Sequence, residues 1–86
     1  MRMKIYWHES SKNIIGPKLR ELRKQHGLSQ EKLASLLQLQ GLECNDITIL
    51  RIEKGQRFVP DYEIALIAKF FNVTTDELLG IKEAEP

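Results

Sequence analysis

The chain has 86 residues and a formal net charge of +1, with 42% hydrophobic and 29% charged residues. This length fits one domain with a single modest core, and the composition is typical of folded, soluble proteins rather than disordered or membrane-embedded ones. Its apolar runs are too short to span a bilayer and residues 1–7 lack the apolar centre of a signal peptide, so the sequence predicts a cytoplasmic protein.

Two helices are predicted in the first half of the chain. Asn13 is a good cap and Pro17 is tolerated in a first turn, so we expect a helix that begins between them and ends at Gly27. Ser29 can cap a second helix that runs to about Gln38. Apolar residues at helical spacing indicate the inward faces, Ile15, Leu19 and Leu22 in the first helix and Leu33, Ala34 and Leu37 in the second.

A third, shorter helix follows Gly41. Asn45 can cap it and Gly55 ends it, with Ile49 and Ile52 toward the core. It is about ten residues long.

The last third of the chain predicts two more helices. Pro60 suits the first position of a fourth helix that ends at Asn72. Thr74 and Glu77 have the spacing of a capping box for a fifth helix, which Gly80 closes. The sequence therefore predicts an all-α domain over residues 13–80, with an N-terminal arm over 1–12 and a tail over 81–86.

Charge is segregated along the chain. Residues 1–57 contain eleven Lys or Arg and six Asp or Glu, whereas residues 58–86 contain two Lys and six acidic residues. This segregation is expected where one face of a domain meets phosphate and another meets water or a partner. Chance variation among solvent-exposed charges is the alternative explanation.

The second and third helices, joined by a turn that contains Gly41, form the helix-turn-helix arrangement of proteins that bind the DNA major groove. Over residues 13–80 the chain resembles the lambda-repressor-like, Cro-type (XRE) helix-turn-helix regulators. The resemblance is carried by IGPKLRELR at 15–23, GLSQEKLA at 27–34, RIEKG at 51–55 and NVTTDELLG at 72–80, which follow the family's order. It implies a compact five-helix domain that binds double-stranded DNA sequence-specifically as a transcription regulator, and we expect a repressor.

The resemblance also implies which residues contact DNA. The Gln that opens the second helix contacts a phosphate in that family, and the N-terminal face of the third helix contacts bases. Arg51 is the strongest candidate, because a guanidinium can bond bidentately to guanine. Phosphate contacts are also implied for two cations beyond the third helix and for some of Lys18, Arg20 and Lys24. The implied DNA-binding residues are Gln30, Asn45, Asp46, Ile47, Arg51, Lys54 and Arg57.

Several features depart from the family pattern and leave alternatives open. Residues 38–44 lengthen the turn, so either the second helix runs longer or an extra loop forms. Asp46 can only accept a hydrogen bond, as from cytosine, and Ile47 or Leu50 packs either on a thymine methyl or against protein. Arg51 has the alternative of an ordinary solvent-exposed charge, paired with Asp46 or Glu43. The alternative function is a protein-interaction module that keeps the fold with a blunted recognition helix.

A second apolar row on the fourth helix predicts self-association. Tyr62, Leu66 and Phe70 recur beside the inward row formed by Ile64, Ile67, Ala68 and Phe71. A small domain does not easily bury both rows, so we expect a twofold homodimer through the fourth and fifth helices, with Tyr6 and Trp7 as candidates to extend it. The predicted interface residues are Tyr62, Leu66 and Phe70.

Other chemistries find little support in the sequence. The single cysteine, Cys44, forms no internal disulfide, and with His8 and His26 it lacks the spacing of a zinc site. Cys44 and His26 also lack a third group that would orient a nucleophilic pair. We therefore expect no metal, no cofactor and no enzyme activity. Cys44 is expected to be a small apolar residue of the turn, and His26 to lie at a helix end.

Overall fold

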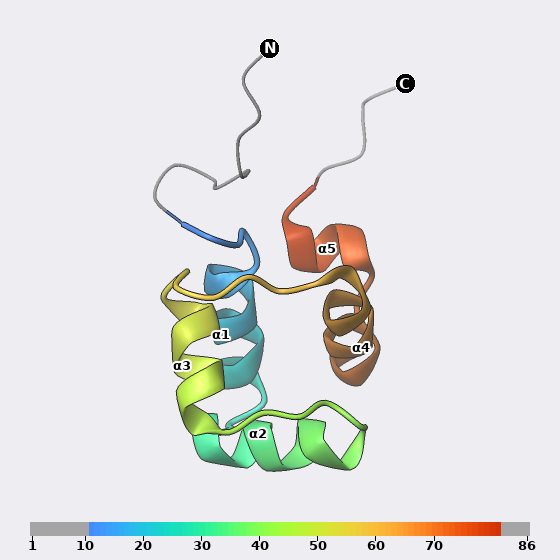
Figure 1. The fold of residues 1–86 in the computed structure, drawn as a ribbon. Helices are drawn as coiled ribbons and strands as arrows, with labels where there is room; N and C mark the ends of the chain where they lie inside the picture. The colour runs from blue at the N-terminus through green and yellow to red at the C-terminus, as the bar shows by residue number, and fades with distance from the viewer. Residues whose placement is uncertain (1–10, 82–86) are drawn as a thin grey trace.

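The computed structural model describes residues 11–81 and places five helices within them. These are α1 (Gly16–Gln25), α2 (Gln30–Leu39), α3 (Asp46–Glu53), α4 (Asp61–Phe71) and α5 (Thr75–Leu79) (Figure 1). The predicted all-α class is therefore confirmed. Tyr6, Trp7 and nearly all of the N-terminal arm lie outside the described residues.

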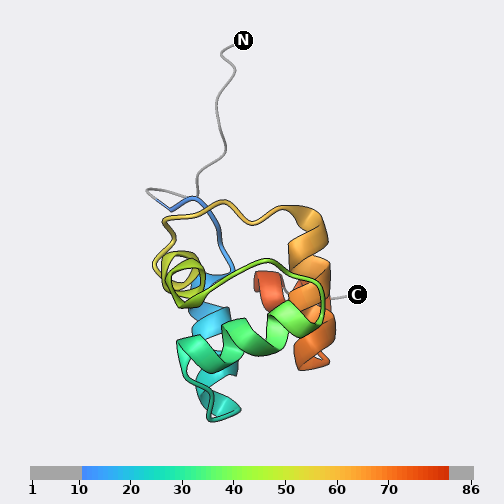
Figure 2. The ribbon, with the colours of Figure 1, turned by 60° about the horizontal axis from the view of Figure 1, so that its bottom comes forward.

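The five helices, arranged as in Figures 1 and 2, pack around one hydrophobic core. Helix α3 packs on both α1 and α2, while α5 packs on α1 and α4. The fully buried side chains come from all five helices and from the residue before α1, which is why no helix is a separable unit. They are Ile15, Leu19, Leu33, Leu37, Ile49, Ile52, Ile67 and Leu78.

Side-chain caps fix where α2 and α5 begin, whereas α1 begins without one. The cap residue of α1 is Ile15, so the predicted cap at Asn13 is wrong by two residues, although the Asn13 carboxamide oxygen accepts from the Gly16 amide at 2.9 Å. The Ser29 hydroxyl accepts from the third amide of α2 at 3.0 Å. The Thr74 hydroxyl accepts from the Glu77 amide at 3.0 Å, the half of the predicted capping box that the structure contains. Each bond satisfies an amide that has no partner within its helix.

One predicted helix start is wrong by a residue. Pro60 precedes α4 as its cap, with φ −66° and ψ 160°, and Asp61 is the first helical residue. The extended ψ of Pro60 is the reason, because a residue with that conformation is not part of a helix. The later part of α4 agrees with the sequence, since Asn72 ends it in the left-handed conformation at φ 57°.

The long turn before α3 is a loop rather than an extension of α2. Helix α2 ends at Leu39, and Gly41 has φ +96°, a conformation that favours glycine. The chain then runs on with Leu42 and Cys44 buried, and the Gln38 side chain donates to the Cys44 carbonyl oxygen. The additional residues thus add two side chains to the core.

Candidate nucleic-acid interface

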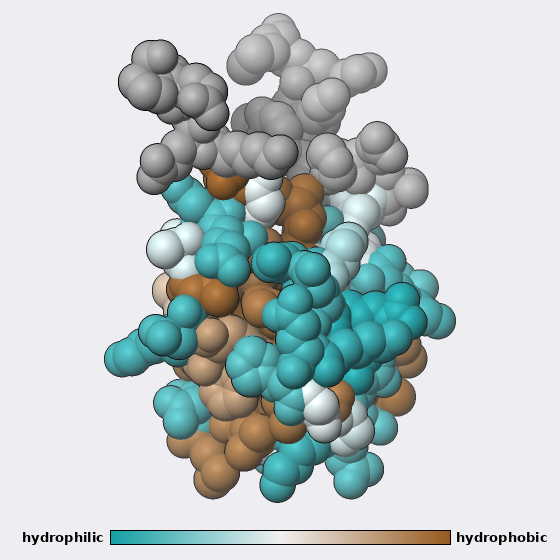
Figure 3. All heavy atoms as spheres, turned by 180° about the vertical axis from the view of Figure 1, so that it is seen from behind, coloured by the Kyte–Doolittle hydropathy of each residue, from teal (hydrophilic) through white to brown (hydrophobic). Residues whose placement is uncertain are grey.

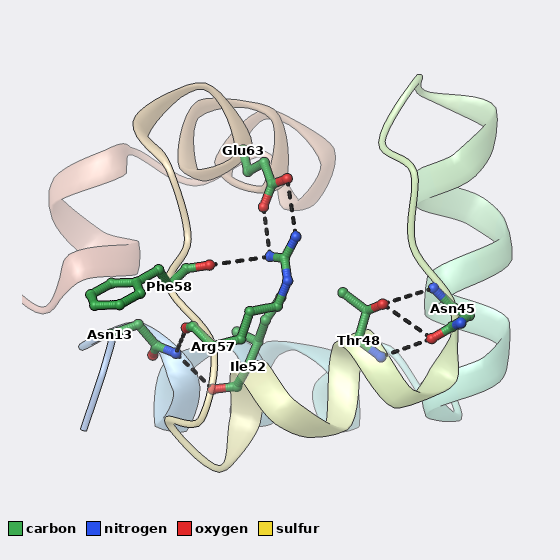
Figure 4. A network of polar contacts seen from close by, with 7 residues as sticks. All are labelled: Asn13, Asn45, Thr48, Ile52, Arg57, Phe58 and Glu63. Atoms are coloured by element: carbon green, nitrogen blue, oxygen red, sulfur yellow. Dashed lines mark hydrogen bonds and ion pairs between the residues drawn. The ribbon is translucent and has the colours of Figure 1, made fainter. Parts of the chain in front are cut away.

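Helix α3 begins with a reciprocal cap. The Asn45 side-chain oxygen accepts from the Thr48 amide at 2.9 Å, and the Thr48 hydroxyl accepts from the Asn45 amide at 3.2 Å (Figure 4). The sequence predicted Asn45 as the cap but missed the contribution of Thr48, although a hydroxyl residue three positions after a cap is a recognisable signal. These two hydrogen bonds fix the first turn of α3, where base contacts were predicted.

Helix α3 has one buried face and one solvent-exposed face. Ile49 and Ile52 are completely covered by the core, whereas Asp46, Ile47 and Arg51 are exposed. The three exposed residues lie within the first two turns, and Arg51 follows Ile47 by about one turn, so both lie on the same side. The structure thus brings together, at the surface, three of the residues predicted to contact bases.

Arg51 takes no part in the ion pairs found within residues 11–81. Those pairs join Lys18 to Glu21, Arg23 to Glu53, and Arg57 to Glu63. The predicted alternative, in which Arg51 pairs with Asp46 or Glu43, is therefore not present in this structure.

A buried ion pair joins α1 to the end of α3. Arg23 donates to the two carboxylate oxygens of Glu53 at 2.6 and 3.1 Å, and its guanidinium also donates to the Leu28 carbonyl oxygen at 2.8 Å. Gln30, the first residue of α2, donates to the same carboxylate at 3.2 Å. Glu53 therefore fixes the start of α2 against α3, and Gln30 has a structural bond in addition to its predicted phosphate contact.

A hollow of about 250 Å³ lies where α1, α2 and α3 meet. It is lined by Arg20, Arg23, Gln30, Leu50, Glu53 and Lys54. Leu50 is half-buried beside it, so this side chain contributes less to the exposed face of α3 than Ile47 does. Arg20 and Lys54 are exposed, which places two positive charges next to the N-terminus of α2.

Arg57 is engaged within the protein. Its guanidinium donates to the two Glu63 carboxylate oxygens at 2.8 and 3.4 Å and to the Phe58 carbonyl oxygen at 3.3 Å (Figure 4). The hydrogen bond to Glu63 is the main cause that raises the pKa of Arg57. The pair fastens the loop after α3 to α4. The phosphate contact predicted for Arg57 stays a prediction. Such a contact requires the Arg57 guanidinium to exchange its bonds with Glu63 or to share them with the phosphate.

Asn13 fixes the C-terminal end of α3. Its side-chain amide donates to the carbonyl oxygens of Ile52 at 3.1 Å and Arg57 at 2.8 Å (Figure 4). The Lys12 amide also donates to the Gly55 carbonyl oxygen at 2.8 Å. Together with the bonds to Glu53, these contacts hold the C-terminal end of α3 against α1 and the start of α2, so its exposed face has a defined orientation relative to both helices.

The apolar row predicted on α4 is only partly free. Tyr62 is 68% exposed, but Leu66 and Phe70 are half-buried and pack against the core. The two rows are thus less separate than the sequence suggested, because α4 is covered over more than one side. A hollow of about 630 Å³ remains, lined by Gln40, Ala65, Leu66, Lys69 and Phe70. Figure 3 views the molecule from behind and shows hydrophobic residues gathered on the side where α4 lies.

Cys44 and His26, which the sequence analysis weighed as metal ligands and as a nucleophilic pair, both contact backbone carbonyl oxygens. Cys44 is buried with its thiol 3.6 Å from the Ala34 carbonyl oxygen, and burial, followed by the charge of Glu63, raises the pKa of Cys44. His26 caps the end of α1, with its Nδ1 2.8 Å from the Leu22 carbonyl oxygen. Residues 11–81 contain no group of three possible metal ligands, and none of their helices is long and apolar enough to cross a membrane.

Comparison with family models identifies the family of the chain. A family model described as a helix-turn-helix domain matches residues 16–81, which covers α1 to α5. No curated protein matches the chain. The match is to helix-turn-helix domains in general, so the resemblance to the lambda-repressor-like branch stays a prediction.

Proposed function

Because the chain belongs to the helix-turn-helix domain family, we propose that it binds double-stranded DNA sequence-specifically by placing α3 in the major groove. The observation that carries the proposal is the geometry of α3. Its exposed face presents Asp46, Ile47 and Arg51, its first turn is capped, and hydrogen bonds at its C-terminal end hold the helix in place. A major groove admits an α-helix, and base edges there differ in their donors, acceptors and methyl groups.

Base contacts follow from the chemistry of the exposed side chains. Arg51 offers a bidentate donor pair to guanine, and Asp46 accepts from the amino group of cytosine. Asn45 is more restricted than its residue type suggests. Its carboxamide oxygen already accepts from Thr48, so its amide nitrogen is the group it offers to DNA.

Backbone contacts are proposed around the hollow between α1, α2 and α3. Gln30 uses one N–H on Glu53 and has a second N–H for a phosphate oxygen, at a helix end with positive potential. Arg20 and Lys54 supply charge nearby. Such contacts orient the protein on the duplex without selecting sequence.

We further propose that the protein acts in the cytoplasm as a dimeric repressor. A single recognition helix buries little DNA surface, whereas two copies about 34 Å apart contact half-sites one duplex turn apart. The exposed Tyr62 and the hollow beside Leu66 and Phe70 support an interface on α4. A bound dimer would exclude other proteins from the operator.

Sedimentation equilibrium tests the dimer. Replacing Leu66 and Phe70 by Glu places charge in the proposed interface, and we expect helical monomers from a wild type that is dimeric at tens of micromolar. Because both side chains also touch the core, Tyr62→Glu serves as a milder companion variant. A monomeric wild type, or variants that remain dimeric, would refute this interface.

Fluorescence anisotropy with labelled duplexes tests DNA binding. Arg51→Ala is expected to lose about 1–3 kcal/mol and the preference at one base pair, whereas Lys54→Ala weakens all duplexes equally and reduces the salt slope by about one. Equal loss on all sequences for Arg51→Ala would make Arg51 a phosphate contact.

The exposed Asp46 and Ile47 favour one second candidate, a protein-interaction module. An interaction module would fail to bind random duplex even at low salt. A DNA-binding protein should show nonspecific binding there, because phosphate neutralisation does not depend on sequence.

A further inference from the structure

Ile47 stands out on the exposed face of α3. It is 46% exposed in the first turn, between the polar Asp46 and the capping Thr48. The other partly exposed apolar residue of α3, Leu50, lines the hollow shared with α1 and α2. The sequence did not distinguish Ile47 from Leu50 as the residue that contacts DNA. In the structure, Ile47 is the one on the outer surface.

Isoleucine has neither a hydrogen-bond donor nor an acceptor. In the major groove, the C5 methyl of thymine is the apolar group that a base pair presents, while the other positions present polar atoms. Ile47 placed against a polar base edge would cover donors or acceptors without replacing their bonds, which is unfavourable. Against a thymine methyl, both apolar groups leave water together.

Arg51 lies about one turn beyond Ile47 on the same face. Four residues of α-helix rise about 6 Å, and base pairs are spaced about 3.4 Å apart, so the two side chains reach positions about two base pairs apart when α3 runs along the groove. The apolar contact of Ile47 and the bidentate contact of Arg51 are therefore expected at base pairs a fixed distance apart.

We infer that each half-site contains a thymine whose methyl group packs on Ile47, and a guanine about two base pairs away that bonds to Arg51. The inference rests on the proposed function and specifies the DNA that this site takes. Ile47 is a specificity-determining residue in this arrangement, because it favours the base pair that has a methyl group at that position.

Replacing thymine by deoxyuridine tests the inference directly, since this removes the methyl and preserves base pairing. Duplexes selected from a random library are resynthesised with one thymine at a time changed to deoxyuridine, and Kd is measured by anisotropy. At one position per half-site we expect wild-type affinity to fall about fourfold, the factor that corresponds to one buried methyl-sized group.

The matched variants are Ile47→Ala and Ile14→Ala. Ile47→Ala should bind the thymine and deoxyuridine duplexes equally, with its helical circular dichroism unchanged. Ile14 is 43% exposed beside Pro17 and Leu79, so Ile14→Ala removes the same atoms at similar exposure and should retain the fourfold difference. Ile47→Val keeps a β-branched side chain and should retain most of it.

The possible failures are distinguishable. A selected duplex that binds wild type but shows no thymine sensitive to deoxyuridine overturns the inference and leaves DNA binding intact. The inference is overturned in the same way if Ile47→Ala keeps the full difference, or if no guanine lies within about three base pairs of the sensitive thymine. Failure to select any duplex removes the proposed function itself, and the inference with it.

Discussion

Replacing Glu53 by Gln perturbs the ion pair that holds the helix-turn-helix together. Glu53 accepts two bonds from Arg23, and Arg23 is 9% exposed. The variant keeps the size of the side chain and removes its charge, which leaves a buried guanidinium without its counter-ion. The same carboxylate accepts from Gln30, so the start of α2 loses a fixed partner as well.

The expected loss of stability is substantial for a domain of this size. Removing one partner of a buried ion pair costs about 3–5 kcal/mol. The Gln carbonyl oxygen still accepts a hydrogen bond, and Arg23 keeps its bond to the Leu28 carbonyl oxygen, so we expect about 2–3 kcal/mol. That loss corresponds to a fall in Tm of roughly 10–20 °C, against a total stability of roughly 4–13 kcal/mol.

Urea unfolding followed by circular dichroism measures this loss. Glu21→Gln is the matched control, because the Lys18–Glu21 pair is exposed on α1 and its removal should change stability by less than about 0.5 kcal/mol. A double variant with Met at Arg23 and Glu53 removes both charges and should be more stable than Glu53→Gln. Equal effects of Glu53→Gln and Glu21→Gln would refute the assignment of the buried pair as a structural link.

Three further predictions concern stability. Gly16→Ala should destabilise by about 1–3 kcal/mol, although alanine normally favours a helix, because its Cβ would lie 2.5 Å from the Ile52 carbonyl oxygen; a stabilised variant in urea unfolding would contradict this. Asn45→Ala should lose about 0.5–2 kcal/mol through the missing cap, whereas Asn45→Asp should lose little; equal losses would exclude the bond to Thr48 as the cause. Because folding raises the pKa of Cys44 above its ordinary 9.0, the folded state favours the neutral thiol, so wild type should lose stability relative to Cys44→Ala from about pH 8 to pH 10; a constant difference across that range would refute this.

The helices were largely predictable because local signals and core packing agree. Ser29, Asn45 and Thr74 act as caps where the sequence placed them, and Gly55 and Gly80 lie at the predicted ends with positive φ. These signals work within a few residues of chain, since a capping side chain bonds to an amide three positions away. Pro60 was misplaced by one residue, which is the ordinary uncertainty of a helix boundary.

The polar interactions around the site were not predictable in the same way. Arg23 and Glu53 are 30 residues apart in the chain, and charged residues are usually interpreted as surface residues. Glu63 is buried although it is charged, because its ion pair with Arg57 neutralises the charge. The packing of α1 against α3 determines the Arg23–Glu53 pair, and the path of the loop before α4 determines the Arg57–Glu63 pair. The sequence therefore identified Arg57 as a cation without identifying its partner.

Selection of bound duplexes from a random library, followed by salt-dependent Kd measurement on the enriched sequence, tests most directly whether α3 contacts bases in the major groove. We expect one enriched, twofold-repeated motif, with log affinity falling linearly with log salt concentration and with Arg51→Ala losing preference at the guanine. A library that shows no enrichment, together with no binding of any duplex at low salt, would contradict DNA binding by this chain.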